Sequence, residues 1–344
     1  MLHNIPITLT IYHRLHSECE RIEQVSDWRG QAARPRVNWC EQGYIVLFQA
    51  LRKRRQLSSV QLLFVGVFVM QLIACATPTS KLIDIADKQG LERADVKANG
   101  FEHLVLQKTA SVARSSTLHV YLEGDGTPWK YRVLRMRDPT PRYPLMLELM
   151  AADESPAVYL GRPCYNGSFD DPGCSDDLWT SARYSDQVVS SMAAAVKKLQ
   201  QSTGATNVRL FGHSGGGALA LLMAERIPDV THIVTLAGNL DTEAWVAHHG
   251  YTPLYGSLNP ANRDRLRESV VQWHLIGRND TVIPPSLVKR FILLQPNVFA
   301  TEIDRFTHGC CWSKIWPTVL SGLSNNDTRR IPGARLRARR VLTN

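Results

Sequence analysis

The pattern of apolar and polar positions changes at about residue 100. Beyond that point, short apolar or alternating runs typical of strands recur at residues 101–107, 118–122, 157–160, 208–211, 232–236, 270–276 and 299–306. Between them, apolar residues recur every three or four positions, as in amphipathic helices, at residues 144–150, 185–201, 215–226, 286–294 and 312–323. Strands that alternate with helices predict the α/β class: a mostly parallel sheet with helices on both faces.

The segment before residue 76 has the composition of a secretory signal. Four consecutive basic residues, 52–55, precede an apolar run at 60–74, and a small residue comes directly before Cys75. A charged segment followed by an apolar one and small residues is typical of a signal peptide. The apolar run is shorter than the roughly 20 residues that a membrane span needs. An uncleaved signal anchor and a buried apolar helix are the alternatives.

The end of this apolar run, Leu72-Ile73-Ala74-Cys75, resembles a bacterial lipobox. The resemblance implies that Cys75 is lipidated and becomes the new N-terminus, anchored on a membrane. Ala76 in place of Asp implies sorting to the outer membrane, facing the periplasm. The predicted organisation is a leader of uncertain status, best explained by a mis-assigned start, at 1–51, a signal peptide at 52–74, a linker at 75–99, an α/β domain at 100–324 and a basic tail at 325–344.

The formal net charge of +9 is concentrated in two clusters. Basic residues gather at 52–55 and again between positions 329 and 340, and acidic and basic residues roughly balance between these clusters. We therefore predict no nucleic-acid partner. The basic tail is interpreted as a solvated segment, and contact with anionic lipid headgroups near the anchor is the alternative.

Four cysteines belong to the predicted exported domain: Cys164, Cys174, Cys310 and Cys311. An even number in an exported protein favours disulfides and allows three pairings. A bridge between Cys164 and Cys174 would close a short loop that has little core of its own. The adjacent Cys310 and Cys311 could bridge each other, stay reduced, or pair with the other loop. No pair has the two-residue spacing of zinc sites, so no metal is predicted.

A glycine-flanked serine, Gly212-His213-Ser214-Gly215-Gly216, lies between a predicted strand and a predicted helix. A sharp turn there exposes the hydroxyl in a strained backbone conformation, and crowding requires glycines two positions before and after it. The helix that follows directs its free N–H groups at the site. Ser214 is therefore the predicted nucleophile. The alternatives are an inert serine in a glycine-rich turn and a phosphate-binding loop, which lacks the expected Gly-Lys-Ser/Thr.

With this motif in its context, the sequence resembles the α/β-hydrolase superfamily, whose lipases and esterases carry Gly-His-Ser-x-Gly. The resemblance covers roughly residues 100–323. In that fold an acid and then a histidine follow the serine along the chain, each in a loop after a strand. It implies a triad of Ser214 as nucleophile, His308 as base and Asp280 as the acid that orients the imidazole. Asp241 is the rival acid, and no cofactor is implied.

The resemblance also implies an oxyanion hole made of two backbone N–H groups. One belongs to Gly215, and the other to Asp125, with Gly124 as the fallback. The loop reads Glu123-Gly124-Asp125-Gly126 where the family carries His-Gly-x-Gly, so Glu123 is a departure. An acidic side chain in this loop either orients the loop or repels anionic substrates. A plain Gly-Asp-Gly turn is the alternative.

Residues 239–269 follow a strand after which the family commonly inserts a cap. A short cap segment is therefore expected here, and the residues that would line the substrate pocket are Trp245, His249, Tyr251 and Tyr255. Ordinary packing at the sheet edge is equally open. A short cap favours a small or medium acyl substrate. The predicted function is hydrolysis of carboxylic esters through an acyl-enzyme; a peptidase, amidase or thioesterase of the same fold and a non-catalytic envelope lipoprotein are the alternatives.

Overall fold

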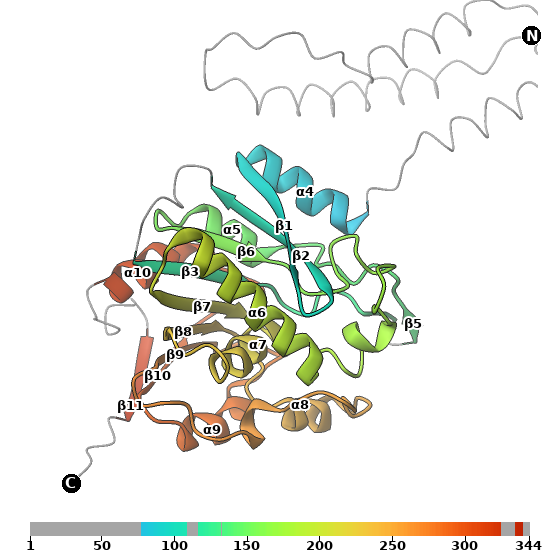
Figure 1. The fold of residues 1–344 in the computed structure, drawn as a ribbon. Coiled ribbons are helices and arrows are strands. Elements are labelled where there is room, and N and C mark those ends of the chain that lie inside the picture. Colours follow the sequence, from blue (N-terminus) through green and yellow to red (C-terminus); the bar gives the residue numbers. More distant parts are fainter. Residues whose placement is uncertain (1–76, 109–115, 132, 325–333, 340–344) are drawn as a thin grey trace, which may run out of the picture. The chain divides into compact units, whose positions relative to one another are not determined.

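The computed structural model describes residues 77–108, 116–131, 133–324 and 334–339. The predicted leader, the predicted signal peptide and Cys75 lie outside this part of the chain. The described residues form a nine-stranded sheet with helices on both faces, and a separate two-stranded hairpin (Figure 1). The predicted fold class is confirmed.

The sheet has the order β1-β2-β6-β3-β7-β8-β9-β10-β11. The six strands from β6 to β10 in this order are parallel, and β1, β2 and β11 pair antiparallel at the two edges. The strands are β1 (Leu91–Ala98), β2 (Phe101–Lys108), β3 (Thr117–Leu122), β6 (Ala157–Leu160), β7 (Asn207–His213), β8 (Val230–Leu236), β9 (Val271–Gly277), β10 (Val298–Ile303) and β11 (Ala334–Arg339).

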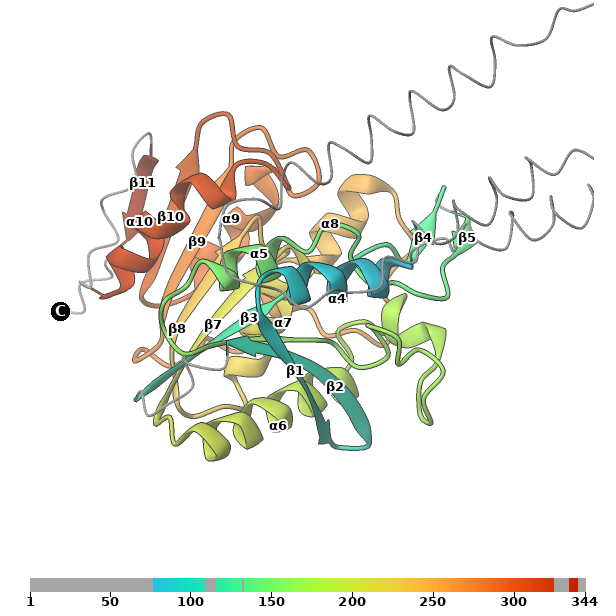
Figure 2. The same cartoon turned by 90° about the horizontal axis from the view of Figure 1, so that it is seen from above.

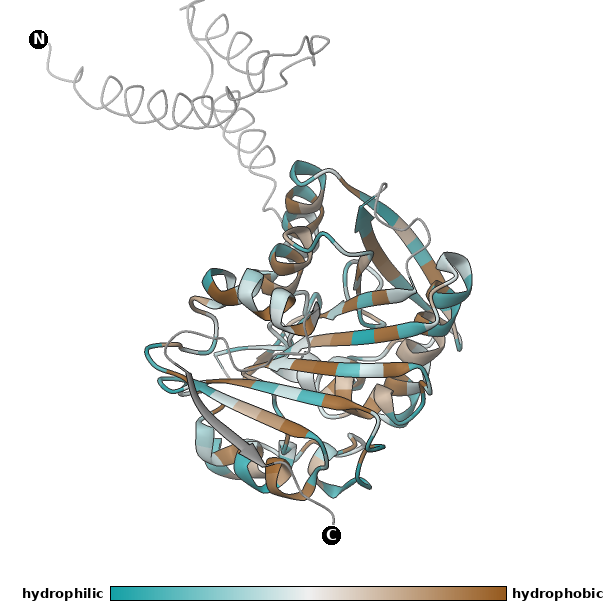
Figure 3. Ribbon diagram, turned by 90° about the vertical axis from the view of Figure 1, so that its left-hand side faces the viewer, coloured by the Kyte–Doolittle hydropathy of each residue, from teal (hydrophilic) through white to brown (hydrophobic). Residues whose placement is uncertain are grey.

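Two apolar layers cover the sheet, one on each face. Helices α6, α7 and α9 pack in the first layer, and α4, α5 and α10 in the second (Figure 2). Figure 3 shows apolar residues recurring along the strands between these layers. The helices are α4 (Pro78–Lys88), α5 (Leu145–Ala151), α6 (Asp186–Thr203), α7 (Gly215–Ala224), α8 (Thr242–His249), α9 (Pro285–Leu294) and α10 (Trp312–Ser324).

The order of the parallel strands determines where a site can form. The chain passes from β3 to β6 on one side and then returns to β7 on the other side of β3. Such a reversal opens a crevice at the carboxyl ends of the strands. The loop 123–126 follows β3 and the serine of the glycine-rich turn follows β7, so both are at this edge. The sheet therefore brings the predicted oxyanion loop and the predicted nucleophile to the same edge.

The linker predicted at 75–99 is wrong for most of its length. Thr77 caps the N-terminus of α4, with its side chain accepting the Ser80 N–H at 3.1 Å, and Pro78 occupies the first turn. Leu82 and Ala86, four positions apart, are buried against the second apolar layer. Strand β1 then pairs along its whole length with β2. The helical spacing and the Thr-Pro start were the signals that could have predicted α4.

Two other segments are more regular than predicted. Helix α8 lies within the segment 239–269, where Asp241 caps its N-terminus. Within the predicted basic tail, strand β11 pairs antiparallel with β10, so that prediction is wrong for these six residues. The rest of the tail lies outside the described residues. None of the helices in the described ranges is both long enough and apolar enough to cross a membrane.

We expect Leu82→Ala to lower the free energy of unfolding by about 2–5 kcal/mol, because it opens a cavity beneath α4. Leu82 is fully buried, whereas a linker side chain would contribute almost nothing. Urea denaturation of the full chain measures the change. Asp87→Ala, on the exposed face of the same helix, is the control and should stay within about 0.5 kcal/mol. Equal values for the two variants would contradict the role assigned to α4.

Candidate active site

Ser214 occupies a sharp turn between β7 and α7. Its backbone has φ 53° and ψ −119°, a strained conformation for a residue other than glycine. A side-chain carbon on Gly212 would lie 2.3 Å from the Gly216 carbonyl oxygen, and one on Gly216 would lie 2.2 Å from the Leu122 carbonyl oxygen. The turn therefore requires glycine at both positions, as its sequence predicted.

Asp280 and His308 meet at the ends of two neighbouring strands. Asp280 follows β9 and His308 follows β10, and the parallel pairing of these strands brings the two loops together. His308 Nδ1 is 2.9 Å from Asp280 Oδ2, and Asp280 is buried. Its other carboxylate oxygen accepts the N–H groups of Val282 and Ile283, both at 2.8 Å. The carboxylate is thus held in place to accept a hydrogen bond from Nδ1 of the imidazole.

Ser214 and His308 line the same cavity, which has a volume of about 900 Å³. A second histidine supports the loop of the first: His213 Nε2 donates to the His308 carbonyl oxygen at 2.8 Å. Burial and, to a smaller extent, the nearby His308 together lower the pKa of His213 to about 4. His213 is therefore neutral near neutral pH. Its imidazole positions the backbone of His308, five residues past the last residue of β10.

The rival acid Asp241 performs a different task. Its Oδ1 accepts the Ala244 N–H at the start of α8 and the Asn259 Nδ2–H, at 3.1 and 3.0 Å. Asp304, another aspartate near the last parallel strand, pairs with Arg278 at 2.6 Å. Of these three aspartates, only Asp280 contacts the imidazole of His308.

The loop 123–126 after β3 contains two acidic side chains in different environments. The Glu123 carboxylate is buried and accepts the N–H groups of Met146 and Gly124, at 2.9 and 3.2 Å. Burial raises its pKa to about 7, against the opposite influence of these hydrogen bonds. The Gly124 N–H, which was the fallback candidate for the oxyanion hole, thus already donates to the Glu123 carboxylate. In the described part of the chain, the N–H groups of Asp125 and Gly215 donate to no protein acceptor.

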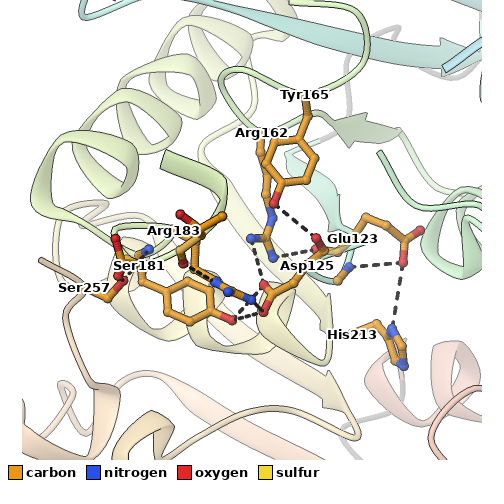
Figure 4. A network of polar contacts seen from close by, with 11 residues as sticks. Glu123, Asp125, Arg162, Tyr165, Ser181, Arg183, His213 and Ser257 are labelled. Carbon is orange, nitrogen blue, oxygen red and sulfur yellow. Dashed lines mark hydrogen bonds and ion pairs between the residues drawn. The ribbon is translucent and has the colours of Figure 1, made fainter. Parts of the chain in front are cut away.

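The Asp125 carboxylate lies at the centre of a buried charged cluster (Figure 4). Arg162 Nη1 and Arg183 Nη1 each approach it at 2.9 Å, and Tyr184 Oη donates to it at 2.6 Å. Burial would raise the pKa of Asp125, but the two guanidinium groups outweigh it and lower the pKa to about 2. Two further donors hold the backbone of this loop: Arg162 Nη2 donates to the Glu123 carbonyl and Tyr165 Oη to the Asp125 carbonyl, both at 3.1 Å. We call Arg162, Arg183 and Tyr184 the aspartate clamp.

The cavity contains part of the predicted substrate pocket. Trp245 and Tyr251 line it, whereas His249 and Tyr255 do not. His249 instead stacks on Tyr251 with the ring centroids 5.1 Å apart and contacts the Val282 carbonyl at 2.8 Å. Tyr255 is 71% exposed. The sequence analysis missed other lining residues that come from outside the cap, which are Trp129, Arg142, Tyr143 and Arg183.

The four cysteines form two disulfides, Cys164–Cys174 and Cys310–Cys311. The first closes the loop near Tyr165, which contacts the Asp125 backbone. The second comes directly after His308 and Gly309 in the loop that carries the imidazole. Within the described ranges, no group of three or more His, Cys, Asp or Glu side chains is placed to hold a metal ion.

Comparisons with known proteins agree with this architecture. The family model described as alpha/beta hydrolase fold matches residues 171–275. A Pyrococcus furiosus esterase is 15% identical, with 70% of this chain and 92% of that one covered and a TM-score of 0.49. A puromycin hydrolase is 16% identical, with 72% and 41% covered and a TM-score of 0.51. No match was found among curated proteins. The protein therefore has the α/β-hydrolase fold, which by itself does not define a reaction.

We expect Asp125→Ala to lower the free energy of unfolding by about 3–5 kcal/mol, because two buried guanidinium groups lose the anion between them. Asp84→Ala is the matched control: it removes the carboxylate of an exposed pair with Lys88, in which both side chains are more than half exposed. Such a pair contributes less than about 1 kcal/mol. Denaturation curves at neutral pH compare the two variants. A similar small loss in both would show that the cluster contributes no more than a surface pair.

Proposed function

We propose that this protein is a serine hydrolase that cleaves carboxylic esters through an acyl-enzyme. The observation that carries the proposal is the 2.9 Å contact between His308 and the buried Asp280, at the wall of the cavity that also contains Ser214. A histidine oriented by a buried carboxylate and a serine on a strained turn are the two parts that nucleophilic catalysis by a hydroxyl requires.

In the proposed reaction, the Ser214 hydroxyl oxygen attacks the ester carbonyl carbon while His308 Nε2 takes its proton. Asp280 stabilises the imidazolium that results without taking the proton itself. The carbonyl oxygen becomes an oxyanion, and the N–H groups of Gly215 and Asp125 are the proposed donors to it. The imidazolium then protonates the leaving alcohol as the C–O bond breaks. Water deprotonated by His308 cleaves the acyl-enzyme by the reverse path and restores the serine.

The cavity is large enough for an acyl group of medium size. A volume of about 900 Å³ is near the upper end of ordinary ligand pockets. Its apolar wall includes Trp129, Trp245 and Leu254. An apolar wall beside a half-buried serine supports a hydrophobic acyl group in preference to a charged one. Amides and thioesters react by the same steps, so they are the alternative substrates.

We also propose that the protein is an exported lipoprotein of the outer membrane, anchored through lipid on Cys75. This rests on the order of the charged, apolar and small residues before Cys75. The intact mass of the mature protein tests it. A chain that begins at Cys75 and carries acyl groups is the expected result, and an unmodified chain would contradict the anchor.

Ser214→Ala should abolish labelling by a fluorophosphonate probe and lower kcat for p-nitrophenyl esters by about 10⁴-fold or more. Ser286→Ala, an exposed serine at the start of α9, is the control and should keep both. Esters of increasing acyl length, tested beside matching amides and thioesters, identify the preferred bond. If Ser214→Ala were labelled as strongly as the parent chain, the proposed nucleophile would be wrong.

Asp280→Asn should lower kcat by about 10⁴-fold with little change in KM, because the amide permits the wrong imidazole tautomer. The matched variant is Asp241→Asn, which keeps an N-cap acceptor for α8 and should retain activity. Steady-state kinetics on one p-nitrophenyl ester distinguishes them. A large loss in Asp241→Asn together with an active Asp280→Asn would transfer the role of acid to the rival residue.

A further inference from the structure

Apolar side chains are exposed in one cluster beside the cavity. Residues 128–131 and 133–143, which we call the rim segment, contain the hairpin of β4 (Trp129–Lys130) and β5 (Leu134–Arg135). Nine large apolar side chains are exposed in the described part of the chain, and five of them are in this segment. They are Trp129 (41% exposed), Tyr131 (80%), Val133 (80%), Leu134 (57%) and Tyr143 (91%). Such a cluster is a mark of an interaction surface.

The rim segment also forms part of the mouth of the cavity. Trp129, Arg142 and Tyr143 are both exposed and among the residues that line it. Whatever covers the exposed side chains of the rim segment therefore lies next to the entrance through which a substrate must pass.

Cationic side chains are interleaved with the apolar ones. Lys130 lies over the ring of Tyr131, 5.1 Å from its centroid. Among the described residues, no carboxylate is within ion-pair distance of Lys130 or Arg142. Exposed aromatic and aliphatic side chains beside free lysine and arginine are suited to the boundary between lipid headgroups and acyl chains. The positive charges would face anionic headgroups.

The start of the described chain lies next to the rim segment. Thr79 Oγ1 donates to Asp138 Oδ2 at 2.9 Å and lies 3.3 Å from Thr140 Oγ1. Figure 2 shows the N-terminal end of α4 on the same side of the molecule as β4 and β5, and Figure 1 shows it on the same side as β5. Cys75 comes four positions before Thr79, a distance of at most about 14 Å for an extended chain. A lipid on Cys75 would thus enter a membrane close to the rim segment.

We propose that the rim segment docks on an anionic phospholipid bilayer, so that the cavity opens toward the membrane and takes its ester substrates from it. The proposal rests on the proposed function, both for the lipid on Cys75 and for ester cleavage. Val133 and Leu134 enter the acyl region, the rings of Tyr131 and Tyr143 lie at the headgroups, and Lys130 and Arg142 pair with phosphates. The substrate class that follows is amphiphilic esters dissolved in the bilayer.

The test uses the lipidated full chain on vesicles of phosphatidylcholine with phosphatidylglycerol. Two activities are compared: hydrolysis of a water-soluble p-nitrophenyl ester and of an acyl ester embedded in the vesicles. The variant Tyr131→Ser/Val133→Ser changes two rim residues that do not line the cavity. It should keep the soluble activity and lose about tenfold or more of the vesicle activity. Leu293→Ser/Leu294→Ser, exposed apolar residues on α9, is the control and should keep both.

Equal vesicle activity in the rim variant and the parent chain would overturn the docking proposal. If the parent chain hydrolysed neither ester, the proposed function would fail, and docking would then be decided by limited trypsin digestion of the Ser214→Ala chain. Cleavage after Lys130 should slow about fivefold on the anionic vesicles relative to phosphatidylcholine alone. Protection that needs no lipid and rises with protein concentration would instead assign the surface to a second copy of the chain, and would overturn the proposal.

Discussion

Helix α7 begins so close to the end of β3 that a side chain at Gly216 would collide with the carbonyl oxygens of Leu122 and Glu123, 2.2 and 2.7 Å away. This close backbone approach fixes two things at once. It holds Ser214 in a conformation that costs backbone strain, and it sets the loop 123–126 against the free N–H groups at the start of α7. The glycines are therefore a condition for the site as a whole, because any larger residue would separate the serine from the loop.

The loop 123–126 requires compensation for a buried carboxylate at Glu123 and a largely buried one at Asp125, and the two receive it differently. Asp125 is surrounded by the aspartate clamp, whose two guanidinium groups lower its pKa to about 2 and so favour the ionised carboxylate. Glu123 is compensated by backbone N–H groups and by Arg162, but burial outweighs them and raises its pKa to about 7. Its carboxyl is therefore partly protonated near neutral pH. Its ionisation therefore costs the folded state stability as pH rises from the unfolded pKa, near 4.3, through 7. The charge of Asp125 therefore serves to hold the two arginines, whereas the charge of Glu123 depends on pH near neutrality.

Sequence reasoning predicted the parts of the molecule that follow local rules. The spacing of apolar residues predicted the alternation of strands and helices, and the Gly-x-Ser-x-Gly motif predicted the glycine requirement at 212 and 216. Order along the chain predicted the two loops that carry Asp280 and His308. Arg162 and Arg183 could not be found this way, because they come from irregular segments next to β6 and α6, and it is the tertiary packing of these elements that places both at Asp125. His249 was misplaced for a related reason: α8 was not predicted, and it places the ring of His249 against the Val282 carbonyl and not among the residues that line the cavity.

The connection between β3 and α5 carries both Asp125, whose N–H is the proposed oxyanion donor, and the exposed rim segment. Movement of the rim segment could therefore displace the donor unless the two are restrained separately. The base of the rim segment is closed by backbone hydrogen bonds, from the Thr127 N–H to the Pro139 carbonyl and from the Met136 N–H to the Pro128 carbonyl, both at 2.9 Å. Trp179 Nε1 donates to the Met136 carbonyl at 3.0 Å and ties this base to the body.

Asp125, on the other side of that base, is held by side chains from outside the rim, namely the aspartate clamp. A force applied to the hairpin, by a membrane or by solvent, therefore meets two separate sets of restraints before it reaches the Asp125 N–H. Burying an ionised carboxylate and two guanidinium groups beside the cavity costs free energy. In return, the aspartate clamp holds the Asp125 N–H, the proposed oxyanion donor, in place while the neighbouring rim segment is available for binding.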